Sequence, residues 1–171
     1  ALGNTSSCGK CLIELYNWGW IKKIPKIAVI NAEGANTLHN LYNGEFENEE
    51  LRWNGGSPNL ELVDRYYDYM NKNNLGPKTK ATAIQIGKPA NIAKGLRALE
   101  FTNGCVIQVS DKEMLDGMSV VGLNGFDCEM ASGATVAGIK KLVDDEIIKN
   151  DDTVVGILTG RQKEPLLPID Y

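Results

Sequence analysis

The feature that most constrains the fold of this chain is a repeated alternation of short apolar runs with stretches of helical periodicity. Residues 27–30 are four consecutive apolar residues bounded by Pro25 and Asn31, which is typical of a strand buried on both faces. Residues 60–70, in contrast, place their apolar side chains at helical spacing. Strands that alternate with helices predict an α/β fold, with a mostly parallel sheet covered by helices on both faces.

The same reasoning predicts the remaining elements along the chain. Further strands are expected at 105–107, 126–130 and 153–158, the last having the clearest strand pattern. Helices are expected at 5–16 and 35–42. A third is expected to begin at Pro89 and to bury Ile92, Leu96 and Leu99, and a fourth to begin at the capping box Ser110–Glu113. The last is expected to begin at Ser132, with Val136, Ile139, Leu142 and Val143 facing inward.

Composition limits the classes of function. The chain has 171 residues, of which 43% are hydrophobic, so we expect residues 1–171 to form one domain, with a polar surface insertion at 44–58. A net charge of −4 argues against nucleic acid or an anionic membrane surface as a partner. No apolar run is long enough to span a bilayer, and four cysteines suggest a reducing compartment, so we expect a cytoplasmic protein.

The cysteines and the histidine do not form a recognisable reactive centre. Cys8 and Cys11 have the spacing of half a zinc site, but Cys105 and Cys128 are isolated and His39 is the only histidine. We therefore expect no metal site, and a serine–histidine or cysteine–histidine catalytic centre is improbable.

The first five residues are the strongest candidate for a binding site. Gly3, Asn4 and Thr5 precede a predicted helix, whose first amides have no partner inside the helix and can hold a phosphate. Ligands of parallel sheets bind where strands end and helices begin. Three segments are expected at that edge: residues 3–5, 131–133 and 159–160. Each alone is more often a cap or a turn, but together they predict a pocket.

Several segments, in chain order, resemble the threonine synthase family. Residues 1–10 (ALGNTSSCGK) are similar to its phosphate loop, and 80–89 (KATAIQIGKP) to its Thr-Ala-Ile-x-Ile-Gly-x-Pro signature. Residues 20–27 and 32–35, and later 109–113, 129–134 and 155–160, complete a collinear set covering nearly the whole chain. The resemblance implies the large-domain portion of a fold-type II pyridoxal-phosphate enzyme. Its expected reaction is a lyase step that converts O-phosphohomoserine and water into threonine and phosphate.

The resemblance also implies roles for individual residues. Ala1, Leu2, Gly3 and Asn4 correspond to the loop whose amides hold the cofactor phosphate, and Asn4 also to the residue that reaches the substrate phosphate. Ala1 replaces an asparagine of that loop, and Gly133 a more usual alanine. Ala83 matches a small residue against the cofactor ring, and Thr159 the hydroxyl beside the ring nitrogen. That hydroxyl is neutral at pH 7, so the ring withdraws fewer electrons than it would beside a carboxylate.

The lysine that forms the Schiff base in this family has no counterpart here, and Lys10, Lys80 and Lys163 are not substitutes. We therefore expect no catalytic residue in this chain, which alone is inactive and needs the missing N-terminal part of the enzyme as its partner. Two alternatives stay open: a sister enzyme such as cysteate synthase, which uses phosphoserine and sulfite, and a non-catalytic remnant that binds phosphate or another subunit.

Overall fold

The computed structural model describes residues 2–54 and 56–161 and has an α/β architecture. Its elements in chain order are α1 (Gly3–Asn17), β1 (Ala28–Ala32), α2 (Thr37–Tyr42), β2 (Trp53–Asn54), β3 (Ser57–Pro58), α3 (Leu60–Lys72), the 3-10 helix η1 (Thr82–Ile84), α4 (Ile92–Thr102), β4 (Cys105–Val109), α5 (Asp111–Leu123) and α6 (Met130–Asp144).

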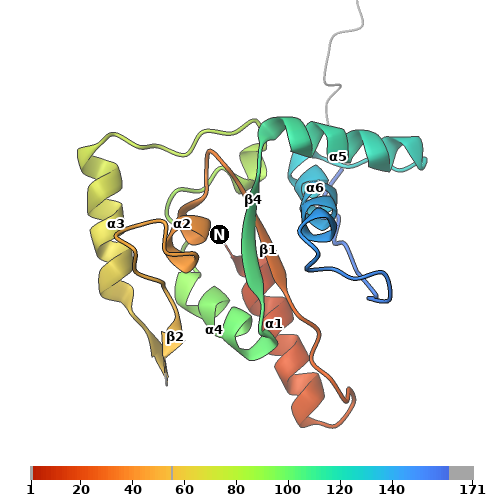
Figure 1. Ribbon diagram of the computed structural model, residues 1–171, viewed down its shortest axis with the longest axis horizontal. Helices are drawn as coiled ribbons and strands as arrows, with labels where there is room; N and C mark the ends of the chain where they lie inside the picture. Colours follow the sequence, from red (N-terminus) through yellow and green to blue (C-terminus); the bar gives the residue numbers. More distant parts are fainter. Residues whose placement is uncertain (1, 55, 162–171) are drawn as a thin grey trace, which may run out of the picture.

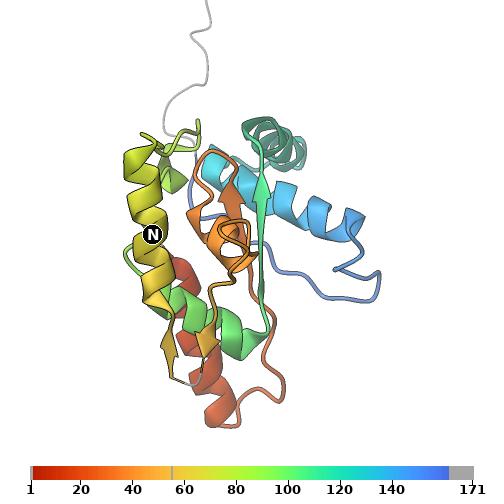
Figure 2. The ribbon, with the colours of Figure 1, turned by 60° about the vertical axis from the view of Figure 1, so that its left-hand side comes forward.

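The centre of the fold is a small parallel sheet of β1 and β4, paired from Ala28 with Cys105 to Ala32 with Val109. Helices lie on both of its faces, with α2, α3 and α4 on one side and α5 and α6 on the other (Figure 1). Figure 2 shows both strands rising side by side between these layers. The predicted α/β class, parallel pairing and helical covering are confirmed for this small sheet.

Each face of the sheet has its own apolar cluster. Val29 and Val106 point into the larger cluster, which contains Leu38, Leu41, Leu51, Leu62, Val63, Tyr66, Met70, Ile92, Leu96 and Leu99. Ala32 and Val109, at the carboxyl ends of the two strands, belong to the second cluster with Ala35, Ala81, Met114, Met130, Ala134 and Ala137. The second cluster therefore packs α6 against the edge of the sheet at which ligands of parallel sheets bind.

Helix α3 and the buried face of α4 agree with the sequence. Ile92, Leu96 and Leu99 are buried, as predicted. Pro89 is not part of α4, however, because the chain turns at residues 90–91 and the helix begins only at Ile92. The capping box that opens α5 is also confirmed: Ser110 Oγ accepts from Glu113 N–H, and the Glu113 carboxylate accepts from Ser110 N–H.

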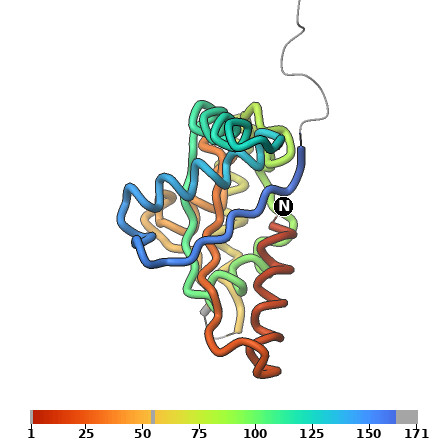
Figure 3. The backbone as a smooth tube through the Cα atoms, turned by 90° about the vertical axis from the view of Figure 1, so that its right-hand side faces the viewer, coloured from red at the N-terminus to blue at the C-terminus, as the bar shows by residue number. Residues whose placement is uncertain are grey.

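The strands predicted at 153–158 and 126–130 are wrong for this structure. Residues 153–161 have no regular secondary structure, and Figure 3 shows them crossing the molecule as an extended segment. A strand needs a neighbouring strand for its N–H and C=O groups, and within the described residues only β1 and β4 form the central sheet. Instead, Thr135 Oγ1 of α6 donates to Ile157 C=O at 3.1 Å, and Val155 is 81% exposed. Residues 126–129 form the irregular connection to α6.

The inner face of α6 also differs from the prediction. Leu142 is buried as predicted, but Val136 and Ile139 are only partly buried and Val143 is 47% exposed. Most of the other buried residues are small: Ser132, Gly133, Ala134, Ala137 and Gly138. A Cβ added at Gly133 would overlap the backbone of Met114 in α5, and one at Gly138 would overlap Ile30 of β1. Small residues let α6 approach both neighbours closely, and this requirement overrides the apolar periodicity. Gly133 therefore lies at a helix contact.

Residues 45–50 of the predicted surface insertion 44–58 are mostly exposed, but Leu51 has no exposed surface. Within the described residues, no helix is long and apolar enough to cross a membrane.

Candidate functional site

Helix α1 lies against α4, with Gly9 facing Ala98 so closely that a Cβ on Gly9 would overlap it. The N-terminal end of α1 is anchored by Leu2, whose side chain packs on Gly95 of α4. The first turn of α1 is consequently held at a defined position, while the side chain of Asn4 is exposed.

The backbone around Leu2 presents unpaired donors. Leu2 has φ 60° and ψ 19°, the left-handed conformation, which a leucine adopts only at a cost. A left-handed residue followed by helical residues turns successive N–H groups toward one concave side, and such nests bind anions. Within the described residues, no hydrogen bond reaches the N–H of Gly3, Asn4 or Thr5, and nothing lies within 4 Å of a Cβ built on Gly3. This turn can accept an anionic group.

Thr159 is held by the beginning of α6. Ser132 Oγ, which is fully buried, accepts from the N–H of Thr159 at 3.0 Å and of Gly160 at 3.1 Å. It also lies 3.3 Å from Thr159 Oγ1 and 3.2 Å from Gly160 C=O. Glu129 N–H donates to the same carbonyl of Gly160 at 2.9 Å. Because these hydrogen bonds fix the backbone of residues 159–160, the exposed side chain of Thr159 has a defined position next to α6.

Ala83 lies in η1, within a segment tied to the start of α5. Asp111 accepts hydrogen bonds from the Thr79 hydroxyl and, at 3.0 Å, from Lys80 N–H. Ala81 is buried at the carboxyl edge of the sheet and Ile84 packs against the second cluster, whereas Ala83 itself is exposed. The small exposed side chain of Ala83 leaves room for a ligand beside it.

The structure brings only some of the predicted site residues together. Thr159 joins Ser132, and η1 contacts α6, so both lie near the carboxyl edge of the sheet. Within the described residues no hydrogen bond joins Gly3 or Asn4 to either of them. Ala1 lies outside the described residues. Ser132 is a positioning residue that sequence reasoning named only as part of a helix start, because its contact with Thr159 spans 27 residues.

Cysteine chemistry does not contribute to this edge. Cys128 precedes α6, and burial raises the pKa of its thiol, as do the carboxylates of Asp127 and Glu129. The thiol is therefore protonated at neutral pH and a poor nucleophile. Within the described ranges, no group of three or more histidine, cysteine and acidic side chains is arranged to hold a metal ion.

Comparison with known proteins gives a consistent result. The profile of the family described as "Pyridoxal-phosphate dependent enzyme" matches residues 3–160. The chain is 45% identical over 170 residues to the threonine synthase of Methanosarcina acetivorans, covering 98% of this chain and 36% of that protein. It is 31% identical over 159 residues to the threonine synthase of Methanocaldococcus jannaschii, covering 92% of this chain and 34% of that protein. The chain thus spans about a third of the length of these relatives.

Proposed function

The chain belongs to the family of pyridoxal-phosphate dependent enzymes, and from that premise we propose that it supplies part of the large domain of a threonine synthase. The enzyme would act on O-phosphohomoserine and water and release threonine and phosphate. The observation that carries this proposal is the 45% identity over 98% of the chain to a threonine synthase.

The described residues fit pyridoxal phosphate in three respects. The first turn of α1 offers N–H groups that make no hydrogen bond within the described residues, which suits the dianionic phosphate. Ala83 is small and exposed, which suits a flat ring beside it. Thr159 offers a hydroxyl whose backbone is already fixed by Ser132. We propose that Leu2, Gly3 and Asn4 hold the phosphate, and that Ala83 and Thr159 contact the ring.

When bound, the cofactor supplies an electron sink for charge that develops next to the substrate amine. The contribution of Thr159 is electrostatic. Its hydroxyl keeps its proton at neutral pH, so it can hydrogen-bond the ring nitrogen without placing a negative charge there. The contribution of Ser132 is to hold Thr159 in place, because its buried hydroxyl accepts hydrogen bonds from the N–H groups of Thr159 and Gly160. Asn4, with its exposed side chain, is proposed to reach the phosphate of the substrate.

Catalysis is proposed to need the rest of the enzyme. No lysine of the chain lies at a position where the resemblance places the covalent attachment of the cofactor. We propose that this lysine, and most contacts to the substrate phosphate, belong to the part of the relatives that the chain does not match.

The experiment is a chimaera in which this chain replaces the matching part of the Methanosarcina acetivorans enzyme. We expect it to bind pyridoxal phosphate, seen as a visible absorption band, and to release inorganic phosphate from O-phosphohomoserine. The matched control is the parent enzyme. Cysteate formation from O-phosphoserine and sulfite, without threonine formation, would instead assign the sister reaction. A folded chimaera that binds no cofactor would overturn the proposal and favour a non-catalytic role.

A further inference from the structure

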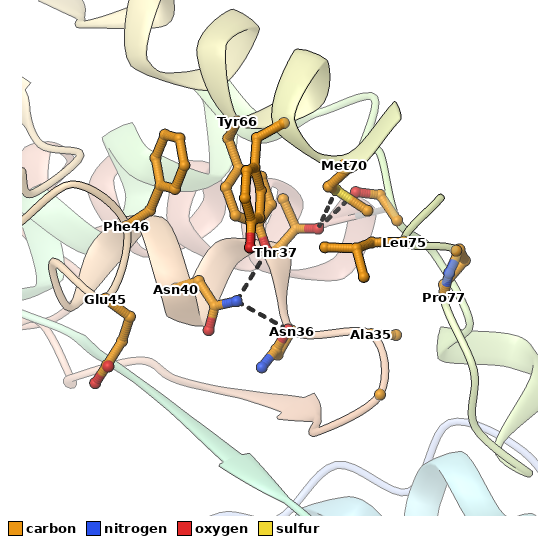
Figure 4. A pocket seen from close by; sticks show the side chains of 14 residues that line it. Ala35, Asn36, Thr37, Asn40, Glu45, Phe46, Tyr66, Met70, Leu75 and Pro77 are labelled. Atoms are coloured by element: carbon orange, nitrogen blue, oxygen red, sulfur yellow. Dashed lines mark hydrogen bonds between the residues drawn. The ribbon is translucent and has the colours of Figure 1, made fainter. Parts of the chain in front are cut away.

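A second candidate site lies away from the residues proposed for the cofactor. A cavity of about 320 Å³ opens between α2, α3 and the segment 75–77. Figure 4 shows its polar and aromatic side chains, which come from α2, the following loop and α3. None of Gly3, Asn4, Ala83 and Thr159 lines it.

The polar floor of the cavity consists of Thr37, Asn40 and Tyr66, and most of its hydrogen-bond donors already have acceptors within the protein. Asn40 Nδ2 donates to Tyr66 OH at 2.8 Å and to Asn36 Oδ1 at 3.1 Å (Figure 4). Thr37 Oγ1 donates to Gly87 C=O at 2.6 Å. An amide nitrogen has two hydrogens, so both donors of Asn40 are occupied. The Asn40 amide oxygen lies 3.5 Å from His39 Nδ1, and an oxygen accepts two hydrogen bonds, so acceptor positions remain on Asn40 and on Tyr66. A ligand that brings hydrogen-bond donors suits this floor best.

The charge of the lining favours a cation. Among the described residues that line the cavity, Glu45 is the only charged one, and none is a lysine, an arginine or a histidine. The neighbouring Glu47 and Glu49 are paired with Arg65 at 2.9 Å and 2.7 Å. Glu45 makes no ion pair with any described residue. Its side chain is exposed and points away from Tyr66 (Figure 4), so its carboxylate can pair with a cation only at the rim of the cavity.

Three aromatic rings line the cavity. The ring centroids of Phe46 and Tyr66 are 5.0 Å apart, and those of Phe46 and Tyr69 are 5.4 Å apart. The faces of such rings attract ammonium groups, and more strongly where water is partly excluded. Met70, Leu75 and Pro77 add apolar surface for a carbon chain.

We propose that this cavity binds a small organic amine, with its ammonium group near Glu45 and Asn40 and its carbon chain along the apolar lining toward Met70. An amino acid fits less well, because its carboxylate would meet Glu45 and find no cation in the lining. The cavity wall is joined to the segment that carries Ala83, since Thr37 binds Gly87 and Gly34 C=O accepts from Lys78 N–H at 2.7 Å. An occupied cavity is thus positioned to steady that segment.

The test uses three probes of similar chain length: n-butylamine, which is protonated at pH 7, 1-butanol and norvaline. Binding is followed by chemical-shift changes of the labelled 171-residue chain and repeated in the chimaera. We expect saturable shifts at residues 34–46 and 66–77 with n-butylamine, and affinity at least about tenfold weaker for the other two probes, as expected for losing or opposing one charge-assisted contact.

Two variants locate the ammonium group. Glu45→Gln should weaken n-butylamine about tenfold and leave 1-butanol unchanged. Phe46→Leu, which removes a ring but keeps apolar volume, should weaken it about two- to fivefold. The matched control is Glu61→Gln, an exposed glutamate of α3 outside the lining.

Equal binding of n-butylamine and 1-butanol, or no effect of Glu45→Gln, would overturn the proposal. Loss of binding in the chimaera alone would also overturn it, by showing that the rest of the enzyme fills the cavity. None of these measurements depends on bound pyridoxal phosphate or on turnover. A failure of the amine-binding proposal can therefore be distinguished from a failure of the proposed function.

Discussion

Ser132 Oγ lies 3.0 Å from the backbone nitrogen of Thr159 and accepts its hydrogen bond, although the two residues are 27 positions apart. This contact connects the beginning of α6 to the hydroxyl proposed to meet the cofactor ring. Residues 153–161 have no strand to pair with in the described structure. The hydrogen bonds to Ser132 therefore hold this segment at Thr159 and Gly160.

Removing the hydroxyl of Ser132 should make residues 159–160 more mobile. Ser132→Ala removes the buried hydroxyl that accepts from the N–H groups of Thr159 and Gly160, and losing such hydrogen bonds costs about 0.5–1.5 kcal/mol each. We expect amide hydrogen exchange at 159 and 160 to accelerate and the urea midpoint to fall. Thr135→Val is the matched control: it deletes an exposed bond to Ile157, and we expect a change within about 0.5 kcal/mol. Unchanged exchange in Ser132→Ala would contradict this role of Ser132.

The hydroxyl of Thr159 should matter for the cofactor and not for the fold. In the chimaera, Thr159→Val removes the hydrogen-bonding group from an exposed side chain, whereas Thr159→Ser keeps it. We expect Thr159→Val to weaken pyridoxal phosphate binding about five- to thirtyfold, the range for one hydrogen bond to a ligand, and Thr159→Ser to stay near wild type. Titration of the visible absorption band measures both. Equal affinities of the two variants would remove Thr159 from the site.

Glycines on α5 should respond with opposite signs. A Cβ at Gly117 would overlap Gly133 C=O of α6, so Gly117→Ala should destabilise by about 1–3 kcal/mol through overpacking. Gly122 lies on the same helix with open space around it, so Gly122→Ala should stabilise by up to about 1 kcal/mol. Urea unfolding of both variants measures this difference. A destabilised Gly122→Ala would show that helix propensity does not control that position.

The capping box of α5 predicts that part of the free energy of unfolding is lost at acidic pH. The backbone N–H of Ser110, and then its hydroxyl, donate to the Glu113 carboxylate and lower its pKa from the ordinary value of 4.5. A lowered folded-state pKa stabilises the protein fully above the unfolded pKa, and this contribution disappears as pH falls through the folded pKa. The stability difference between wild type and Glu113→Gln should therefore be largest at neutral pH and shrink toward pH 3.

Urea midpoints at several pH values test this, with Asp116→Asn as the control, because Asp116 is an exposed carboxylate on the same helix. A difference between wild type and Glu113→Gln that does not vary with pH would contradict the assignment. In a separate variant, Ser110→Ala should cost about 1 kcal/mol, the usual value of an N-cap.

Predictions from the sequence succeeded where the signal is local. The spacing of Val63, Tyr66 and Met70 predicts a helix with one buried face, and α3 buries these three residues. The box of Ser110 and Glu113 acts over three residues and is present in the structure. The collinear motifs predict a pyridoxal-phosphate enzyme, and the profile match over residues 3–160 confirms that family. The roles of Asn4, Ala83 and Thr159 stay predictions.

Long-range contacts decided the rest. The apolar pattern of 153–158 describes side chains that suit a strand, but a strand also requires a neighbour, which no local pattern supplies. The inner face of α6 includes the small residues Gly133, Ala137 and Gly138 because two other elements approach it closely.

The sequence by itself therefore determined the helices with strong periodicity, the caps and the family, since these depend on residues a few positions apart. Only the tertiary structure decided that Ser132 holds Thr159 and that Glu45 and three aromatic rings share a cavity, because such contacts depend on how distant segments pack.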